Sequence, residues 1–164
     1  MNHKFKRYLL SGLLVLVLII TGCSGGEQEK TTTITDMLVR QVSVPDKIER
    51  VVAVGPGSLR LLSHLNAVDK VVGVEEAEQR ENWGGPYNLA NPKFQELPVI
   101  GPRHGGDAEL IIAQNPDVIF FYGDPAQAKS LEQKTGVAVV GIKYVDLGFS
   151  RERYLYKSWR LIGQ

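Results

Sequence analysis

The amino-acid sequence predicts an α/β fold, a Rossmann-like parallel sheet with helices on both faces. Short apolar runs rich in β-branched residues alternate with segments of helical periodicity. The runs are apolar at nearly every position, as in strands buried on both faces. The chain has 164 residues, a formal charge of +1, 43% hydrophobic and 23% charged residues. This length and this composition are sufficient for one globular domain with a core. No block of like charge indicates a nucleic-acid partner.

Residues 1–22 are predicted to be a signal peptide. A basic start with Lys4, Lys6 and Arg7 precedes the apolar run 9–20. That run is shorter than the roughly 20 residues of a membrane span. Ile20-Thr21-Gly22-Cys23 resembles the lipobox of bacterial lipoproteins, which implies cleavage before Cys23 and a lipid on its sulfur. The alternative is an uncleaved signal anchor in which Cys23 is incidental.

Residues 23–33 contain the lipidated cysteine and small polar side chains, which predict a flexible tether. Cys23 is the single cysteine, so the chain forms no internal disulfide. The expected location is therefore the extracytoplasmic side of a cell membrane, with the protein held by its lipid anchor.

The folded lobe is expected over residues 34–149, and its first half begins with a strand or hairpin. The helix over 58–66 has leucines at helical spacing, with Ser58 as N-cap. Residues 75–97 are polar and broken by Gly and Pro, which indicates a loop. Strands are predicted at 34–45, 49–54, 70–74, 118–122 and 137–142.

Two further helices are marked by their ends. Asp107 is placed to cap one helix, and Pro116 ends it. Asp124-Pro125 begins the next helix, with the proline in the first turn, and Gly136 ends it. Ligands of open parallel sheets bind beyond the carboxyl ends of the strands. The loops expected to meet at that edge are 55–60, 75–76, 101–106 and 122–123.

The turn Gly55-Pro56-Gly57-Ser58 is similar in spacing to a dinucleotide-binding turn, but it lacks the third glycine. Arg60 stands at that position, and Pro56 removes one backbone N–H from any phosphate cradle. Glu75 and Glu76 could imitate the acid that binds the ribose. An exported chain rarely meets a dinucleotide, so this function is disfavoured.

Other enzyme chemistry has little support, and the chain is not expected to be an enzyme or to carry a cofactor or a metal. His64 and His104 are the histidines left after the signal peptide, too few for a histidine-rich zinc site. No Ser/His/Asp arrangement suggests a triad. Aromatic and arginine side chains in the edge loops suit a bulky or anionic ligand instead. These are Trp83, Tyr87, Tyr122, Tyr144, Arg60, Arg80 and Arg103.

Several segments together resemble the N-terminal lobe of the substrate-binding lipoproteins of ABC importers for ferric siderophores, haem and cobalamin. After the lipobox, D-M-L-V-R-Q-V-S-V-P is similar to the family's opening motif, except that Val39 stands where the family usually has Gly. The segments E-R-V-V-A-V-G-P-G-S and L-P-V-I-G follow. D-A-E-L-I-I-A-Q-N-P-D-V-I-F-F and L-E-Q-K-T-G-V-A-V-V complete the match.

The resemblance implies a two-lobed protein that clasps a metal chelate between its lobes and delivers it to the permease subunits of the importer. Carried over by position, the ligand-binding residues of this lobe are Pro56, Gly57, Ser58, Leu59, Arg60, Arg103, His104, Gly105, Tyr122 and Gly123. The turn at Gly55 is then expected to line a ligand cleft.

Residues 150–164 are predicted to be the start of the helix that joins the two lobes, with apolar positions at Leu155, Trp159 and Ile162. The second lobe is expected to be absent, which would leave half a cleft and weaken ligand binding. The alternative function is a truncated, lipid-anchored interaction domain without transport activity.

Overall fold

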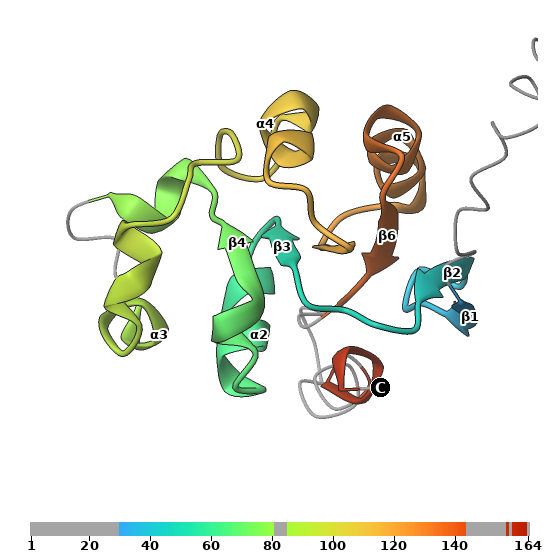
Figure 1. Cartoon of the computed structure of the whole chain (residues 1–164), viewed down its shortest axis with the longest axis horizontal. Coiled ribbons are helices and arrows are strands. Elements are labelled where there is room, and N and C mark those ends of the chain that lie inside the picture. The colour runs from blue at the N-terminus through green and yellow to red at the C-terminus, as the bar shows by residue number, and fades with distance from the viewer. Residues whose placement is uncertain (1–29, 81–84, 144–156, 158, 164) are drawn as a thin grey trace, which may run out of the picture.

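The computed structural model describes residues 30–80, 85–143, 157 and 159–163 (Figure 1). The strands are β1 (Thr31–Thr35), β2 (Gln41–Pro45), β3 (Val51–Val54), β4 (Val71–Gly73), β5 (Val118–Phe121) and β6 (Ala138–Gly141). The α-helices are α2 (Ser58–His64), α3 (Pro86–Leu89), α4 (Ala108–Ala113) and α5 (Pro125–Thr135). Single 3-10 turns lie at Val68–Lys70, Glu76–Gln79 and Pro92–Gln95.

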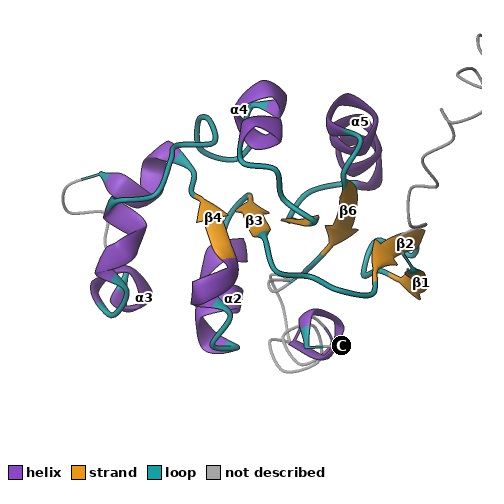
Figure 2. Cartoon of the chain, viewed as in Figure 1, coloured by secondary structure: helices purple, strands orange, loops and turns teal. Residues whose placement is uncertain are grey.

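The central sheet has the strand order β4-β3-β5-β6, and all of its neighbouring strands are parallel. Helix α2 lies on one face, and α4 and α5 lie on the other (Figures 1 and 2). The predicted α/β class is therefore confirmed. The chain moves from β3 outward to β4, then returns past β3 to β5, so the direction of winding reverses between β3 and β5. Ligands of such sheets bind at this switch point.

Each face of the sheet has its own apolar layer, because successive strand residues point to opposite faces. One layer joins the leucines of α2 to the sheet, and the other joins α4 and α5 to it. The first layer includes Val51, Ala53, Leu59, Leu61, Leu62, Val118 and Phe120. The second includes Val52, Val54, Ile111, Ile119, Phe121, Ala128 and Leu131.

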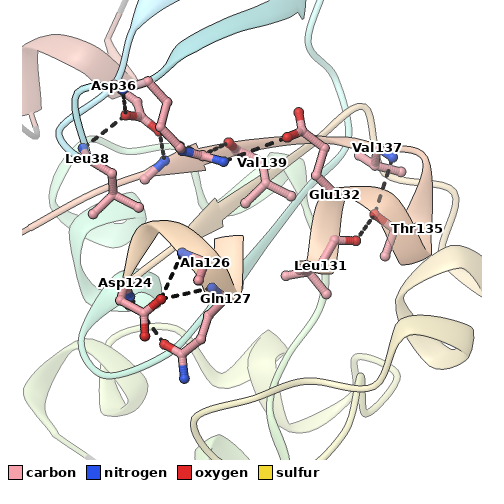
Figure 3. A network of polar contacts seen from close by, with 12 residues as sticks. Asp36, Leu38, Asp124, Ala126, Gln127, Leu131, Glu132, Thr135, Val137 and Val139 are labelled. Carbon is pink, nitrogen blue, oxygen red and sulfur yellow. Dashed lines mark hydrogen bonds and ion pairs between the residues drawn. The ribbon is translucent and has the colours of Figure 1, made fainter. Parts of the chain in front are cut away.

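The predicted ends of α4 and α5 are confirmed, whereas the predicted N-cap of α2, Ser58, is wrong. Asp107 accepts hydrogen bonds from the N–H groups of the α4 first turn, Asp124 forms a capping box with Gln127 (Figure 3), and Gly136 ends α5 with φ 70°. Helix α2 is instead capped by Gly57 at φ 72°, and Ser58 is fully buried. The Ser58 hydroxyl donates to the Val54 carbonyl at 3.0 Å, because the turn after β3 is too tight for it to face outward.

The amino-terminal hairpin begins earlier than predicted. Strand β1 starts at Thr31, and Thr31–Thr33 pair with Ser43–Pro45 of antiparallel β2. The end of the predicted tether at residue 33 is therefore wrong, since these threonines favour extended backbone and have a partner strand.

The turn between β1 and β2 anchors the hairpin to the edge of the central sheet. Asp36 accepts hydrogen bonds from the N–H groups of Leu38, Arg40 and Gly141, at 2.9, 2.9 and 3.0 Å. The Arg40 guanidinium binds the same carboxylate and also donates to the Val139 carbonyl (Figure 3). These contacts tie the motif Asp36–Arg40 to β6.

The described residues of the segment 75–97, which are 75–80 and 85–97, have more regular structure than the predicted loop. They contain α3 and two 3-10 turns, and Phe94 is fully buried. The Gln79 side-chain amide donates to the carbonyls of Phe94 and Leu97, at 2.9 and 2.6 Å. Polar side chains that satisfy backbone groups stabilise this segment, so hydropathy did not reveal it.

The carboxyl-terminal segment lies near α2. Residues 157 and 159–162 are helical, and the Trp159 ring meets the edge of His64 with centroids 6.1 Å apart. Leu155 and the predicted helix start lie outside the described residues. Among the described helices, none is long and apolar enough to cross a membrane.

Val39 has a backbone conformation that a β-branched residue rarely adopts. Its φ is 62°, and its side chain is 85% exposed, so no packing compensates for the strain. We expect Val39→Gly to stabilise the fold by about 1 kcal/mol, measured by urea unfolding. Asn66→Gly is the matched control, because Asn66 also has positive φ (57°) but asparagine tolerates it. An equal or larger gain in the control would contradict this account of Val39.

Candidate functional site

The first two loops of the site meet at the switch point of the sheet. Tyr122 follows β5, and its N–H donates to the Val54 carbonyl at the end of β3, at 2.9 Å. Gly55, the next residue, has φ 92°, and a Cβ added to it would lie 2.5 Å from the Tyr122 carbonyl oxygen. The two loops are therefore in direct backbone contact, which explains why a glycine stands at this position.

Glu75 joins a third loop to this edge. It follows the β4 region, is 5% exposed, and lies beneath the other loops. One carboxylate oxygen accepts from the Gly55 N–H and the other accepts from the Gly105 N–H, each at 3.2 Å. Loops that are 20 and 30 residues away from Glu75 in the sequence are thus held by one side chain.

Burial raises the pKa of the Glu75 carboxyl above its usual value of 4.5. The N–H groups of Gly55, Gly105 and His104 lower this pKa in part, and the charge of Glu78 raises it further. A raised folded-state pKa means that the carboxyl contributes its full stability below the unfolded pKa. That contribution is lost as the pH rises through the folded pKa.

The stability of the fold should therefore depend on pH through Glu75. We expect the wild type to be most stable relative to Glu75→Gln near about pH 4. Its free energy of unfolding, relative to that of the variant, should decrease toward about pH 8. Urea unfolding of both proteins across this range measures the difference. A difference that grows with pH would contradict the assigned direction of the shift.

The loop 101–106 is compact where it leaves the core and exposed at its tip. Gly101 has φ 120°, and a Cβ there would lie 2.4 Å from the Asp107 nitrogen, so the loop closes tightly on the start of α4. Arg103 and His104 are exposed at the tip, and His104 has φ 68°. Partial desolvation of the His104 ring, and then the charge of Arg103, lowers the pKa of His104. Its imidazole is therefore less readily protonated than an ordinary histidine.

A cavity of about 630 Å³ opens beside this loop, between α4 and α5. His104 and Gly105 line one end, Phe121 forms part of the wall, and Gln127, Ser130 and Lys134 contribute polar groups from α5. The cavity therefore adjoins the predicted edge and includes two of the predicted ligand-binding residues.

The structure brings most of the predicted ligand-binding residues to the same edge. Pro56 and Gly57 are half-buried in the turn after β3, and Arg60 is half-buried in the first turn of α2. Gly123 follows Tyr122, and a Cβ there would lie 2.4 Å from the Phe121 ring, so this loop has no room for a side chain. Ser58 has its hydroxyl bound to Val54, so only its backbone belongs to the edge surface.

Leu59 is a correction to the predicted set. Its side chain is 3% exposed and belongs to the apolar layer beneath α2. The sequence placed it beside Arg60 in the turn, but helical geometry directs neighbouring side chains to different faces. It therefore supports the turn from the core side and does not line a cleft.

Among the described members of the wider group of aromatic and arginine residues, Arg80 and Tyr87 bond to acids of the segment 75–80. Arg80 forms an exposed ion pair with Glu76 at 2.8 Å, and the Tyr87 hydroxyl donates to Glu78 at 2.7 Å. Trp83 and Tyr144 lie outside the described residues. Of that group, the structure places Arg103 and Tyr122 on the edge loops and Arg60 in the first turn of α2.

Glu75 is the site residue that the sequence did not select. The sequence predicts that the loop 75–76 reaches this edge and that Glu75 could imitate a ribose-binding acid, but it does not include Glu75 among the ligand-binding residues. Both carboxylate oxygens are bound by backbone N–H groups of the chain itself, which is unlike an acid placed for a dinucleotide. Within the described ranges, no group of three or more His, Cys, Asp and Glu side chains could hold a metal ion.

Comparisons with known proteins agree with this geometry. No family model matches the chain. The molybdate-binding protein MolA of Haemophilus influenzae is 31% identical over 87 residues, which are 53% of this chain and 24% of that protein. Its structure with bound molybdate, the periplasmic binding protein of an ABC transporter, has 28% identity and a TM-score of 0.57, covering 68% of this chain and 34% of that one.

Other solved structures share the fold at lower identity. A periplasmic solute-binding protein of Veillonella parvula has 22% identity and a TM-score of 0.64, covering 82% of this chain and 40% of that one. The periplasmic catecholate-siderophore binding protein VctP of Vibrio cholerae has 24% identity and a TM-score of 0.59, covering 82% and 44%. This chain thus spans less than half the length of each of these proteins.

The fold of this chain is that of one lobe of the periplasmic solute-binding proteins. The chain has the fold of the solute-binding proteins of ABC importers and is similar in sequence to one of them, so the resemblance inferred from the sequence is confirmed. These relatives are binding proteins, which agrees with the prediction that this chain is a binding protein and not an enzyme.

Proposed function

We propose that this chain captures a solute outside the cytoplasm for an ABC importer and presents it to the permease. The solute is a metal-containing ligand, either a chelate such as a ferric siderophore, haem or cobalamin, or an oxyanion of the molybdate type. The MolA relative supports the oxyanion, and the siderophore-binding neighbour with the same fold is compatible with the chelate.

The observation that carries this proposal is the convergence of loops from β3, β4 and β5 at the switch point. Gly55, Glu75 and Gly105 are joined by hydrogen bonds, and Tyr122 contacts Gly55. Arg60 in the first turn of α2 and Arg103 in the loop 101–106 are the cations of these segments, and guanidinium groups suit an anionic ligand group.

Titration of the full chain with molybdate, a ferric catecholate, haem and cobalamin tests the proposal. We expect one ligand to bind saturably, and we expect Arg103→Ala to weaken that binding about tenfold, through the loss of a charge-assisted contact. Lys129→Ala, which removes an exposed cation from α5, is the matched control and should leave affinity unchanged. Binding of none of the four ligands would favour an interaction domain without transport activity.

We further propose that the chain is a lipoprotein anchored through Cys23, which lies outside the described residues. The lipobox-like Ile20–Cys23 and the preceding apolar run support this proposal. Cys23→Ser should remove the lipid and release the protein from membranes, whereas Ser24→Ala should not. Membrane retention of the Cys23→Ser protein, with an unchanged intact mass, would exclude the anchor.

A further inference from the structure

Glu75 occupies an unusual place for a carboxylate, beneath the proposed ligand edge and almost closed off from solvent. Its two oxygens are divided between two loops, with the Gly55 N–H on one and the Gly105 N–H on the other, each at 3.2 Å. Both donors are backbone groups of loops that carry proposed ligand-binding residues. A buried carboxylate requires such donors, because desolvation of an unpaired charge is costly.

The neighbouring acid, Glu78, is bonded quite differently. Its carboxylate accepts from the Tyr87 hydroxyl at 2.7 Å and from the Asn88 side-chain amide at 2.8 Å. Those residues belong to α3 and contribute nothing to the edge loops. Of these two acids, then, only Glu75 has hydrogen bonds that join one edge loop to the other.

The two residues that Glu75 joins are both glycines, so neither contributes a side chain to the contact between their loops. Gly55 has positive φ (92°), and a Cβ on Gly105 would meet nothing within 4 Å. The tip of the 101–106 loop is exposed at Arg103 and His104. The Glu75 carboxylate is therefore a tie between the turn after β3 and this exposed tip.

We propose that Glu75 is a positioning residue of the ligand edge. Its carboxylate fixes the turn 55–60 relative to the loop 101–106 and thereby sets the spacing between Arg60 and Arg103, without touching the ligand itself. The expected effect on ligand binding rests on the proposed function. The hydrogen bonds by which Glu75 joins the two loops are a property of the chain alone.

Hydrogen exchange of backbone amides in the full chain tests the tie without any ligand. Glu75→Ala should speed exchange at both Gly55 and Gly105 by about tenfold or more, since a hydrogen bond to a charged group is lost at each. Glu75→Gln keeps one acceptor oxygen and should speed exchange at only one of these two amides. Glu78→Gln, the matched control, should change neither.

A merely structural role would give a different pattern. Exchange that rises equally at amides of β5 and α5 would show general destabilisation and would overturn the proposal, as would unchanged exchange at Gly55 and Gly105 in Glu75→Ala. The second readout is affinity for whichever of the four titrated ligands binds. Glu75→Ala should weaken it about tenfold, and Glu78→Gln should not. If none binds, the proposed function fails, while the exchange result still decides whether Glu75 ties the loops.

Discussion

Replacing Asp36 with alanine is expected to destabilise the fold by about 3–5 kcal/mol, the cost typical of breaking a buried ion pair. The Asp36 side chain is 0% exposed and holds the Arg40 guanidinium at 2.7 Å. The same carboxylate accepts from three backbone N–H groups, including that of Gly141 on β6 (Figure 3). Alanine would leave these donors and a half-buried guanidinium without their acceptor.

Urea unfolding of Asp36→Ala and of the control Asp46→Ala measures this effect. Asp46 is exposed and accepts one hydrogen bond, from Thr32 at 2.8 Å, so its loss should cost about 0.5 kcal/mol. If the two variants had similar stability, the turn Asp36–Arg40 would not be the anchor of the hairpin.

Gly55→Ala is expected to destabilise the fold by about 3 kcal/mol and to abolish ligand binding, because strain at positive φ adds to a steric clash. The new Cβ would lie 2.5 Å from the Tyr122 carbonyl oxygen, and both groups are backbone or attached directly to it. One loop must therefore move away from the other at the switch point.

Gly136→Ala separates the two contributions. Gly136 also has positive φ (70°), but a Cβ there would meet nothing within 4 Å. Its substitution should cost about 1 kcal/mol from strain alone and should leave binding intact. Equal losses of stability in both variants would mean that the contact between Gly55 and Tyr122 contributes nothing.

Much of the fold could be predicted because its signals are local. The strands β3, β5 and β6 are continuous apolar runs, and Asp107, Asp124 and Gly136 mark helix ends by their own chemistry. Position 39 has valine where the family resemblance leads us to expect glycine, and the structure places Val39 at positive φ. The convergence of distant loops could also be predicted from the sequence, because parallel strands present their carboxyl ends at one edge of the sheet.

What the sequence did not reveal depends on tertiary contacts. Serine is a residue type typical of N-caps, but the Ser58 hydroxyl points inward and donates to the Val54 carbonyl. Leu59 was assigned to the cleft by adjacency, whereas burial against the sheet decided its place. Glu75 had no recognisable motif, since its partners are backbone amides of loops distant in the chain.

The most direct test of the central claim is hydrogen exchange of the full chain with and without the ligand that binds. We expect slower exchange in residues 55–60, 101–106 and 122–123, with no change in the hairpin β1–β2. Protection confined to other segments, or none with molybdate, ferric catecholate, haem or cobalamin, would contradict a ligand site at the switch point of this sheet.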